Sequence, residues 1–236
     1  MKWDDYEAAL FDLDGVLTPT AEVHMSAWAQ MFSEFLVDYP GQPPYTDQDY
    51  FDHVDGKPRY EGVAAFLASR GLDLPLGEPS DEPTAPTVCG LGNRKNAVFA
   101  ERLAREGIAP YAGSIQLMDH LETLGVAMAV VSSSKNAPDV LAAAAIAERF
   151  GVVVDGAVAA EHGIPGKPRP DTYAYAADQL GVPHTQCVVF EDAISGVQAG
   201  AAGDFGLVVG VDRGAGSDVL SAHGAQLVVA DLAELI

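Results

Sequence analysis

The sequence has little positive charge, few cysteines and no long run of apolar residues. Thirteen lysines and arginines stand against 34 aspartates and glutamates, which gives a formal net charge of −21. This balance argues against nucleic acid or an anionic membrane as the main partner. The two cysteines are too few for a disulfide framework or a zinc cluster. The N-terminus lacks an apolar signal segment, and no run of about 18 apolar residues occurs, so we expect a cytoplasmic protein without a membrane partner.

The sequence does contain enough apolar material for a sizeable core. Apolar residues make up 48% of its 236 residues, which is typical of a folded globular protein and excludes a disordered chain. A chain of this length forms one large domain or two smaller ones. The composition leaves the oligomeric state open, and a monomer is compatible with it.

Short apolar runs alternate with helical patterns over the second half of the chain. The apolar runs lie at residues 126–131, 152–154, 187–190, 205–209 and 227–229, and the helical patterns at 114–124, 138–150, 170–180 and 193–202. A similar apolar run at residues 8–11 belongs with them. Near-continuous apolar strands separated by helices predict a parallel sheet covered on both faces, and therefore an α/β fold.

The stretch between residues 21 and 106 has a different pattern. Its helical patterns cover residues 22–37, 46–53, 58–70 and 93–106, and no strand pattern interrupts them. Residues 71–88 hold four prolines, too many for a helix or a central strand, and are predicted to form an exposed loop. We therefore predict an α/β core domain of residues 1–20 and 107–236, and an inserted helical domain of residues 21–106. The insertion leaves the sheet directly after the first strand, where it would cap the adjoining site.

Two carboxylates follow the first strand within three residues. Asp12 and Asp14, and then Gly15, come directly after the apolar run at residues 8–11. Open α/β sheets hold their ligands at the carboxyl ends of the strands, where carboxylates are costly unless a metal or a reaction uses them. The pattern is typical of a magnesium site with a carboxylate free to attack. An acidic turn is the alternative, because Asp and Gly both favour turns, and this stretch alone does not decide between the two.

Polar groups of related chemistry occur at three later places in the pattern. The run at 126–131 ends in Ser132-Ser133-Ser134-Lys135-Asn136, whose hydroxyls and amides suit phosphate oxygens, although serine-rich turns are common. Lys167 stands ahead of a helix start, where a solvated surface lysine is the alternative. Glu191 and Asp192 follow the run at 187–190 and either bind a metal or cap the next helix.

The order of these four elements resembles that of the haloacid dehalogenase superfamily, and the resemblance covers essentially the whole chain. It implies a Rossmann-like parallel-sheet core with a helical cap inserted after the first motif. It also implies that Asp12 is a nucleophile that forms an aspartyl phosphate and that Asp14 is the general acid and base. The remaining roles that it implies are magnesium binding by Asp12, the backbone carbonyl of Asp14, Glu191 and Asp192, and binding of the transferring phosphoryl group by Ser132 and Lys167.

Several segments are similar to the β-phosphoglucomutase family in particular. They are residues 11–18 with their continuation through His24 to Trp28, Gly56-Lys57-Pro58-Arg59, Asn93-Arg94-Lys95-Asn96, and the serine turn at 132–136. The resemblance implies a hinge role for His24, phosphate binding by Arg59 and substrate reading by Lys95. The residues that it implies for the second phosphate, together with Arg59, are Ser134, Lys135 and Asn136.

The resemblance implies magnesium-dependent phosphoryl transfer on a small phosphorylated sugar. The reaction would convert β-D-glucose 1-phosphate to glucose 6-phosphate through the 1,6-bisphosphate. A sugar-phosphate or phosphoglycolate phosphatase on the same scaffold is the main alternative, and a non-catalytic module that binds phosphorylated metabolites is a more remote one. The chain departs from the family pattern at Pro19, in the long proline-rich loop and in the spacer at 150–167. These departures concern the identity of the substrate more than the chemistry.

Overall fold

The computed structural model describes the chain from Met1 to Ile236, apart from the side chain of Glu106. The chain forms two compact units, which are described separately. The core unit consists of Met1–Thr20 and Ile108–Ile236, and the helical unit is Ala21–Gly107. In the part of the chain that is described, no helix has the length and apolar character that crossing a membrane requires.

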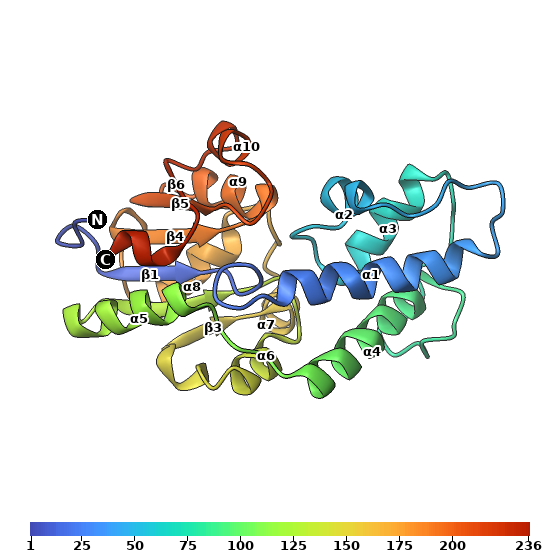
Figure 1. Ribbon diagram of the computed structural model, residues 1–236, viewed down its shortest axis with the longest axis horizontal. Coiled ribbons are helices and arrows are strands. Elements are labelled where there is room, and N and C mark those ends of the chain that lie inside the picture. The colour runs from blue at the N-terminus through green and yellow to red at the C-terminus, as the bar shows by residue number, and fades with distance from the viewer. The chain divides into compact units, whose positions relative to one another are not determined.

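Six parallel strands form one sheet in the core unit, in the order β3-β2-β1-β4-β5-β6 (Figure 1). They are β1 (Ala8–Phe11), β2 (Ala127–Val131), β3 (Val152–Val154), β4 (Cys187–Glu191), β5 (Leu207–Val211) and β6 (Leu227–Val229). The first strand lies in the middle, with Phe11 opposite Val130 of β2 and Phe190 of β4. The residues that follow these three strands therefore meet at one edge of the sheet, and the predicted α/β fold is confirmed.

Helices flank this sheet (Figure 1). They are α5 (Ala112–Leu124), α6 (Ala137–Ala143), α7 (Gly156–His162), α8 (Asp171–Leu180), α9 (Ile194–Ala202) and α10 (Ser217–Ala222), with 3-10 turns at Ala147–Arg149, His184–Gln186 and Leu232–Leu235. Leu10 belongs to an apolar cluster with Tyr173 of α8 and Val197 of α9. The next residue, Phe11, stacks on Phe190 with the ring centroids 4.7 Å apart. Because successive side chains of a strand point to opposite faces, a sheet covered on both faces needs the near-continuous apolar runs seen in the sequence.

The two termini lie side by side in the core unit (Figure 1). The indole Nε1 of Trp3 donates to the carbonyl of Leu235 at 3.2 Å, and the N-terminal amine donates to the same carbonyl at 3.3 Å. The Trp3 ring also packs on Phe190 of β4, with the centroids 6.3 Å apart. These contacts anchor the segment that leads into the central strand.

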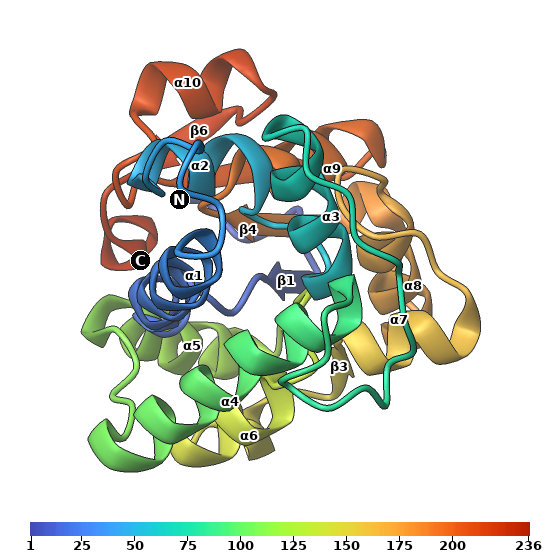
Figure 2. The same cartoon turned by 90° about the vertical axis from the view of Figure 1, so that its right-hand side faces the viewer.

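The helical unit is built from helices, which Figure 2 labels α1 to α4. They are α1 (Thr20–Leu36), α2 (Asp47–His53), α3 (Arg59–Ser69) and α4 (Val88–Glu106). The core of this unit is aromatic: the ring centroid of Phe32 lies 3.9 Å from that of Phe66, 5.3 Å from that of Trp28 and 5.4 Å from that of Tyr45. Between Ala21 and Gly107 the described chain contains no strand, as the helical spacing of the apolar residues predicts.

The structure corrects three details of the predicted elements. Helix α4 begins at Val88 and not at residue 93, because the side chain of Thr87 caps it and accepts a hydrogen bond from the backbone N–H of Gly90. The helix predicted at 138–150 ends at Ala143, because Ala145 adopts a left-handed φ of +55°. Helices α7 and α10 were not predicted, since seven and six residues are too few to show a clear apolar period.

Replacing Phe66 with alanine is expected to destabilise the helical unit. Phe66 is completely buried, and its removal should lower the free energy of unfolding by about 3–5 kcal/mol through lost burial and a residual cavity. Urea denaturation, monitored by circular dichroism and by tryptophan fluorescence in a Trp3→Phe background that leaves Trp28 as the reporter, measures this loss. Val37→Ala is the control, because Val37 is 77% exposed and its replacement should change the free energy by less than about 0.5 kcal/mol. Equal losses in the two variants would contradict the prediction.

Candidate active site

A buried lysine joins two of the predicted site residues. The Nζ atom of Lys167 donates to Oδ1 of Asp12 at 2.5 Å, to the carboxylate of Glu191, and to the carbonyl of Val131 at 3.1 Å. Lys167 is 5% exposed, Asp12 7% and Glu191 1%. Asp12 follows β1, Glu191 ends β4, and Lys167 comes from the loop before α8. Lys167 is therefore not a solvated surface lysine.

The electrostatics of this cluster leave it short of positive charge. Burial raises the pKa of the Asp12 carboxyl well above its usual range, and the carboxylates of Glu191 and Asp14 raise it further, against the opposing effect of Lys167. Burial alone would lower the pKa of Lys167, but the carboxylates of Asp12 and Glu191 outweigh burial and raise it. Lys167 therefore stays protonated, whereas Asp12 needs additional positive charge to be fully ionised.

Three carboxylates come close enough together to hold one cation. Oxygen atoms of Asp12, Glu191 and Asp192 all lie within 4.8 Å of one another. Asp12 and Glu191 share the single positive charge of Lys167, and a divalent cation would add the positive charge that this cluster lacks. Carboxylate oxygens are the ligands that magnesium prefers, so the residues present fit a magnesium site.

Two glycines make room for these carboxylates. Gly15 adopts a left-handed φ of +86°, and a Cβ atom there would lie 1.8 Å from Oδ2 of Asp192. A Cβ atom at Gly196 of α9 would lie 1.8 Å from Oε1 of Glu191. Gly15 is therefore required both by the backbone conformation and by the space that Asp192 occupies.

Tyr173 of α8 belongs to the same cluster, although the sequence did not indicate it. Its hydroxyl donates to Oε1 of Glu191 at 2.8 Å, and its ring centroid lies 5.0 Å from Nζ of Lys167. Burial, together with the charges of Glu191 and Asp12, raises the pKa of Tyr173, so its hydroxyl remains a donor. The other oxygen of Glu191 accepts from the N–H of Ala193 at 3.2 Å. The sequence pattern predicts only that a tyrosine on the buried face of a helix packs in the core, so it did not identify Tyr173 as a site residue.

Asp14 is held within its own loop. The hydroxyl of Thr20 donates to Oδ1 of Asp14. Arg213, which follows β5, donates to the carbonyl of Gly15 at 2.8 Å, and its guanidinium carbon lies 3.9 Å from the ring centroid of Tyr111. The sequence assigned no role to Thr20, although it ends the stretch that follows the first strand, and did not indicate Arg213 at all. Thr20 thus orients the carboxylate of Asp14, and Arg213 holds the backbone at Gly15.

The serine turn after β2 is closed by its own side chains. The hydroxyl of Ser132 accepts from the N–H of Ser134 at 3.1 Å, and the hydroxyl of Ser134 accepts from the N–H of Asn136 at 3.2 Å. Lys135 lies between them in the same turn. The bond from Lys167 to the carbonyl just before Ser132 places the start of this turn beside the buried cluster. Hydroxyls and amide groups in such a turn suit the oxygen atoms of a phosphate.

In the helical unit, two predicted residues lie against each other. Nζ of Lys95 on α4 is hydrogen-bonded to Nδ1 of His24 on α1. The His24 ring stacks on Phe99 with the centroids 4.0 Å apart, and Nζ of Lys95 lies 5.1 Å from the ring centroid of Trp28. Both polar side chains are buried. His24 and Lys95 therefore form one polar cluster with aromatic walls, which favour a cation.

Arg59, the third predicted residue of the helical unit, begins α3. Its guanidinium donates to Oδ1 of Asn96 at 2.7 Å and to Oδ1 of Asn93 at 3.4 Å. Among the described residues, no carboxylate forms an ion pair with it. Burial lowers the pKa of Arg59, but a guanidinium stays charged in proteins. Its charge is therefore not neutralised by the protein, as expected of an anion-binding arginine.

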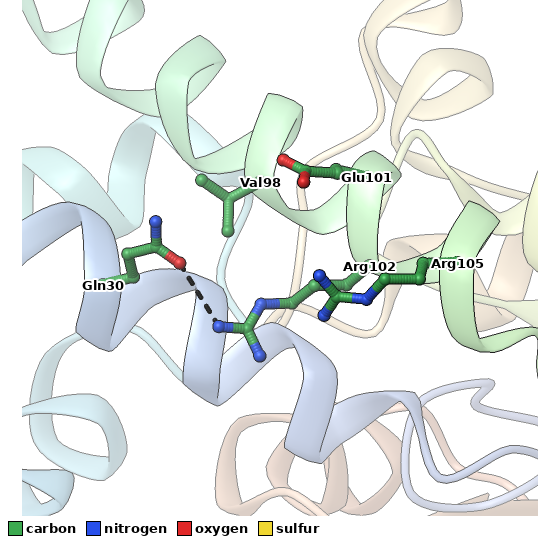
Figure 3. A pocket seen from close by; sticks show the side chains of 5 residues that line it. All are labelled: Gln30, Val98, Glu101, Arg102 and Arg105. Carbon is green, nitrogen blue, oxygen red and sulfur yellow. Dashed lines mark hydrogen bonds between the residues drawn. The ribbon is translucent and has the colours of Figure 1, made fainter.

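A pocket between α1 and α4 lies outside the predicted residues (Figure 3). It has a volume of about 200 Å³ and is lined by Gln30, Val98, Glu101, Arg102 and Arg105. Nη2 of Arg102 donates to Oε1 of Gln30 at 3.2 Å, and Figure 3 shows this bond crossing from one helix to the other. Gln30, Glu101 and Arg105 are exposed, and the lining includes a carboxylate as well as two arginines. The pocket therefore offers no buried polar group for a ligand.

Comparison of the chain with known proteins points to one family. The model of the haloacid dehalogenase-like hydrolases matches residues 6–204. A β-phosphoglucomutase of Mycobacterium bovis is 44% identical over 238 residues, which cover 97% of this chain and 91% of that protein. A β-phosphoglucomutase of Bacillus subtilis is 32% identical over 230 residues, with the same coverage. The crystal structure of a β-phosphoglucomutase from Clostridium difficile has a TM-score of 0.78 at 24% identity, covers 98% of this chain and 93% of that chain, and shows the same fold.

Replacing Lys167 with methionine is expected to destabilise the core unit. The variant keeps much of the packing volume but leaves the buried carboxylates of Asp12 and Glu191 without their shared cation. Removing one partner of a buried ion pair costs about 3–5 kcal/mol, and urea denaturation at neutral pH without added metal measures the loss. Lys2→Met, at an exposed position, is the matched control. An unchanged midpoint for Lys167→Met would show that the buried cluster does not depend on the ammonium group.

Proposed function

The chain belongs to the haloacid dehalogenase-like hydrolases, and we propose that it is a magnesium-dependent β-phosphoglucomutase. Such an enzyme converts β-D-glucose 1-phosphate to glucose 6-phosphate through the 1,6-bisphosphate. The observation that carries the proposal is the 44% identity to the mycobacterial β-phosphoglucomutase along 97% of this chain. The buried cluster at the ends of β1 and β4 supports it, because its residues suit phosphoryl transfer.

In the proposal, Asp12 is the nucleophile. Its carboxylate oxygen forms a bond to phosphorus while the bond from phosphorus to the leaving oxygen breaks, which gives an aspartyl phosphate. Such a transfer depends mostly on positioning and on neutralising the charge of the phosphoryl oxygens. Lys167 and Ser132 would bind those oxygens. Lys167 is already held in place by Asp12 and Glu191, so little reorganisation is needed when the substrate arrives.

The carboxylates of the core cluster would hold the magnesium ion. Asp12, Glu191, Asp192 and the backbone carbonyl of Asp14 are the proposed ligands. When bound, the cation would offset the negative charge of the phosphoryl group in transfer. The close approach of three carboxylates, with oxygen atoms within 4.8 Å of one another, supports this assignment.

Asp14 is the proposed general acid and base. Its carboxylate lies two residues beyond the nucleophile and accepts a hydrogen bond from Thr20. As an acid, it would give its proton to the sugar oxygen that leaves when Asp12 takes the phosphoryl group. As a base, it would take the proton of the hydroxyl that attacks the aspartyl phosphate in the second half of the cycle. The two steps return Asp14 to its starting state, so the cycle needs no further acid or base.

A second phosphate site separates a mutase from a simple phosphatase. The bisphosphate must present each of its ends to Asp12 in turn, and the phosphate that is not reacting needs its own binding site. We assign this role to Ser134, Lys135, Asn136 and Arg59, and contact with the rest of the substrate to His24 and Lys95. The uncompensated charge of Arg59 supports the assignment. A phosphatase of the same family remains the alternative that an assay must exclude.

The proposed partner is a small phosphorylated sugar. A net charge of −21 disfavours polyanionic macromolecules such as nucleic acid. A small anion, in contrast, needs only local positive charge, which Lys167 and Arg59 would supply. We place the activity in the cytoplasm, where sugar phosphates are made and consumed.

The decisive assay supplies β-D-glucose 1-phosphate, magnesium and a trace of the 1,6-bisphosphate. We expect glucose 6-phosphate to form in step with the loss of substrate, with almost no release of free phosphate. Coupled oxidation of glucose 6-phosphate measures its formation. α-D-glucose 1-phosphate serves as the control and should not be converted. Free phosphate released in step with substrate loss, without glucose 6-phosphate, would make the protein a phosphatase.

Separate variants of the two catalytic aspartates test their different roles. Asp12→Asn removes the nucleophile and should lower kcat at least about a thousandfold. Asp14→Asn should lower kcat about 100- to 10,000-fold, because it removes proton transfer. This variant should still form a phosphoenzyme with acetyl phosphate, because the leaving group of acetyl phosphate needs no proton. The phosphoenzyme should be stable enough in acid to be detected and should be hydrolysed in base. Mass spectrometry of the intact chain detects the phosphoryl group. A phosphoenzyme in Asp12→Asn and none in Asp14→Asn would reverse the assignment.

A further inference from the structure

The proline-rich segment between α3 and α4, residues 73–87, is built into the helical unit. We call this segment the strap. The first two N–H groups of α4, at Val88 and Cys89, donate to the carbonyls of Pro75 and Leu76, each at 3.0 Å. Nε of Arg94 donates to the carbonyl of Pro83 at 2.9 Å. The strap therefore provides acceptors that the start of a helix otherwise lacks, and it is fixed to α4 along its length.

Asn93 is the point where the strap reaches the predicted binding residues. Nδ2 of Asn93 donates to the carbonyls of Pro79, at 3.1 Å, and Asp81, at 2.8 Å. Both amide hydrogens are used in this way, and carbonyl oxygens can only accept, so the orientation of the amide is determined by its partners. Oδ1 of Asn93 must then point away from the strap, where it accepts from the hydroxyl of Tyr60 at 3.0 Å and from Arg59 at 3.4 Å.

The aliphatic part of the Arg59 side chain is packed tightly, and its guanidinium is held by hydrogen bonds. A Cβ atom at Gly92 would lie 3.1 Å from Cδ of Arg59 and 2.8 Å from the ring of Tyr60. The start of α3 therefore packs directly on the backbone of α4 at this glycine. With Asn96 bound to the other guanidinium nitrogen at 2.7 Å, the arginine is held by neutral acceptors on α4.

Neutral acceptors leave the charge of Arg59 available. Arg70 and Arg149 show the contrast, because each pairs with a carboxylate, at 2.7 Å and 2.6 Å. An amide oxygen orients a guanidinium by hydrogen bonding but does not cancel its charge. Asn93 and Asn96 thus hold Arg59 in place for an anion, whereas an aspartate at either position would compete with that anion.

We propose that Asn93, oriented by the strap, is a positioning residue that presents Arg59 to the phosphate of the sugar bisphosphate that is not being transferred. This inference rests on the proposed function, and it adds a specificity element that none of the four motifs contains. It assigns the strap to the choice of substrate: a ligand that carries a second phosphate gains from it, and a ligand with only the transferring phosphate does not.

The test is direct binding of β-D-glucose 1,6-bisphosphate to Asp12→Asn, which cannot turn the ligand over. Adding Asn93→Ala should raise the Kd about tenfold, the size of one charge-assisted hydrogen bond. When Asp12 carries the phosphoryl group, the phosphate of β-D-glucose 1-phosphate is the one that is not transferred. In the otherwise wild-type chain, Asn93→Ala should therefore raise KM for β-D-glucose 1-phosphate by a similar factor and change kcat less than about twofold. Phosphorylation of Asp12 by acetyl phosphate, which has no second phosphate, should be unchanged.

Arg59→Ala and the double variant show whether Asn93 acts through Arg59. The two should bind the bisphosphate equally, because Asn93 has nothing left to position. A further loss in the double variant, or slower phosphorylation by acetyl phosphate in Asn93→Ala, would overturn the inference. Met31→Ala is the control for general destabilisation, since Met31 is buried in the aromatic core of the same unit.

The two proposals fail in different arms of this experiment. If the wild-type chain forms no glucose 6-phosphate, the mutase is wrong, whatever Asn93 does. If Asp12→Asn does not bind the bisphosphate, or binds it equally with and without Asn93, the positioning role is wrong, even when the wild-type chain is an active mutase.

Discussion

The ammonium group of Lys167 is the charge on which the core site depends. It lies between two buried carboxylates that are far from it in the sequence, by 155 residues for Asp12 and 24 for Glu191. Neither carboxylate would be stable in that environment alone. The contacts form only when β1, β4 and the loop before α8 are in place, so the folding of the sheet and the assembly of the site are one event. The level register of Phe11 and Phe190 brings the two acids to the same ammonium group.

The cationic side chains of the two units have opposite electrostatic surroundings. In the core, Lys167 is paired with two carboxylates of the protein, and the three carboxylates of the cluster suit a bound cation. In the helical unit, Arg59 has only amide acceptors, and its charge stays uncompensated. A paired lysine stays in position while phosphoryl groups come and go, whereas an unpaired arginine gains most when an anion arrives. This difference suits a reaction in which one phosphate is transferred and another is only held.

The sequence was sufficient to predict the strands and motifs that are recognisable from a local pattern of residues. Apolar runs predict all six strands, and the carboxylates, the serine turn and Lys167 are recognisable because each follows a strand or precedes a helix. Tyr173, Thr20, Arg213 and Asn93 were missed for a common physical reason. Each acts through a contact with a residue from another motif or segment, and such a contact cannot be inferred from the residue's neighbours in the sequence. The early start of α4 was missed because its first turn is stabilised by the Thr87 cap and by carbonyl groups of the strap. The spacing of apolar residues does not reveal such contacts.

The proline-rich loop departs from the family pattern in sequence, and the structure shows which contacts this loop makes. In the sequence it reads only as a long, irregular insertion. In the structure its carbonyls orient the amide of Asn93, and Asn93 in turn faces Arg59. All of these contacts lie within the helical unit, while the proposed nucleophile and the proposed metal ligands lie within the core unit. In the proposed roles, changes in the strap would alter which phosphorylated sugar is bound without disturbing the buried charges assigned to phosphoryl transfer.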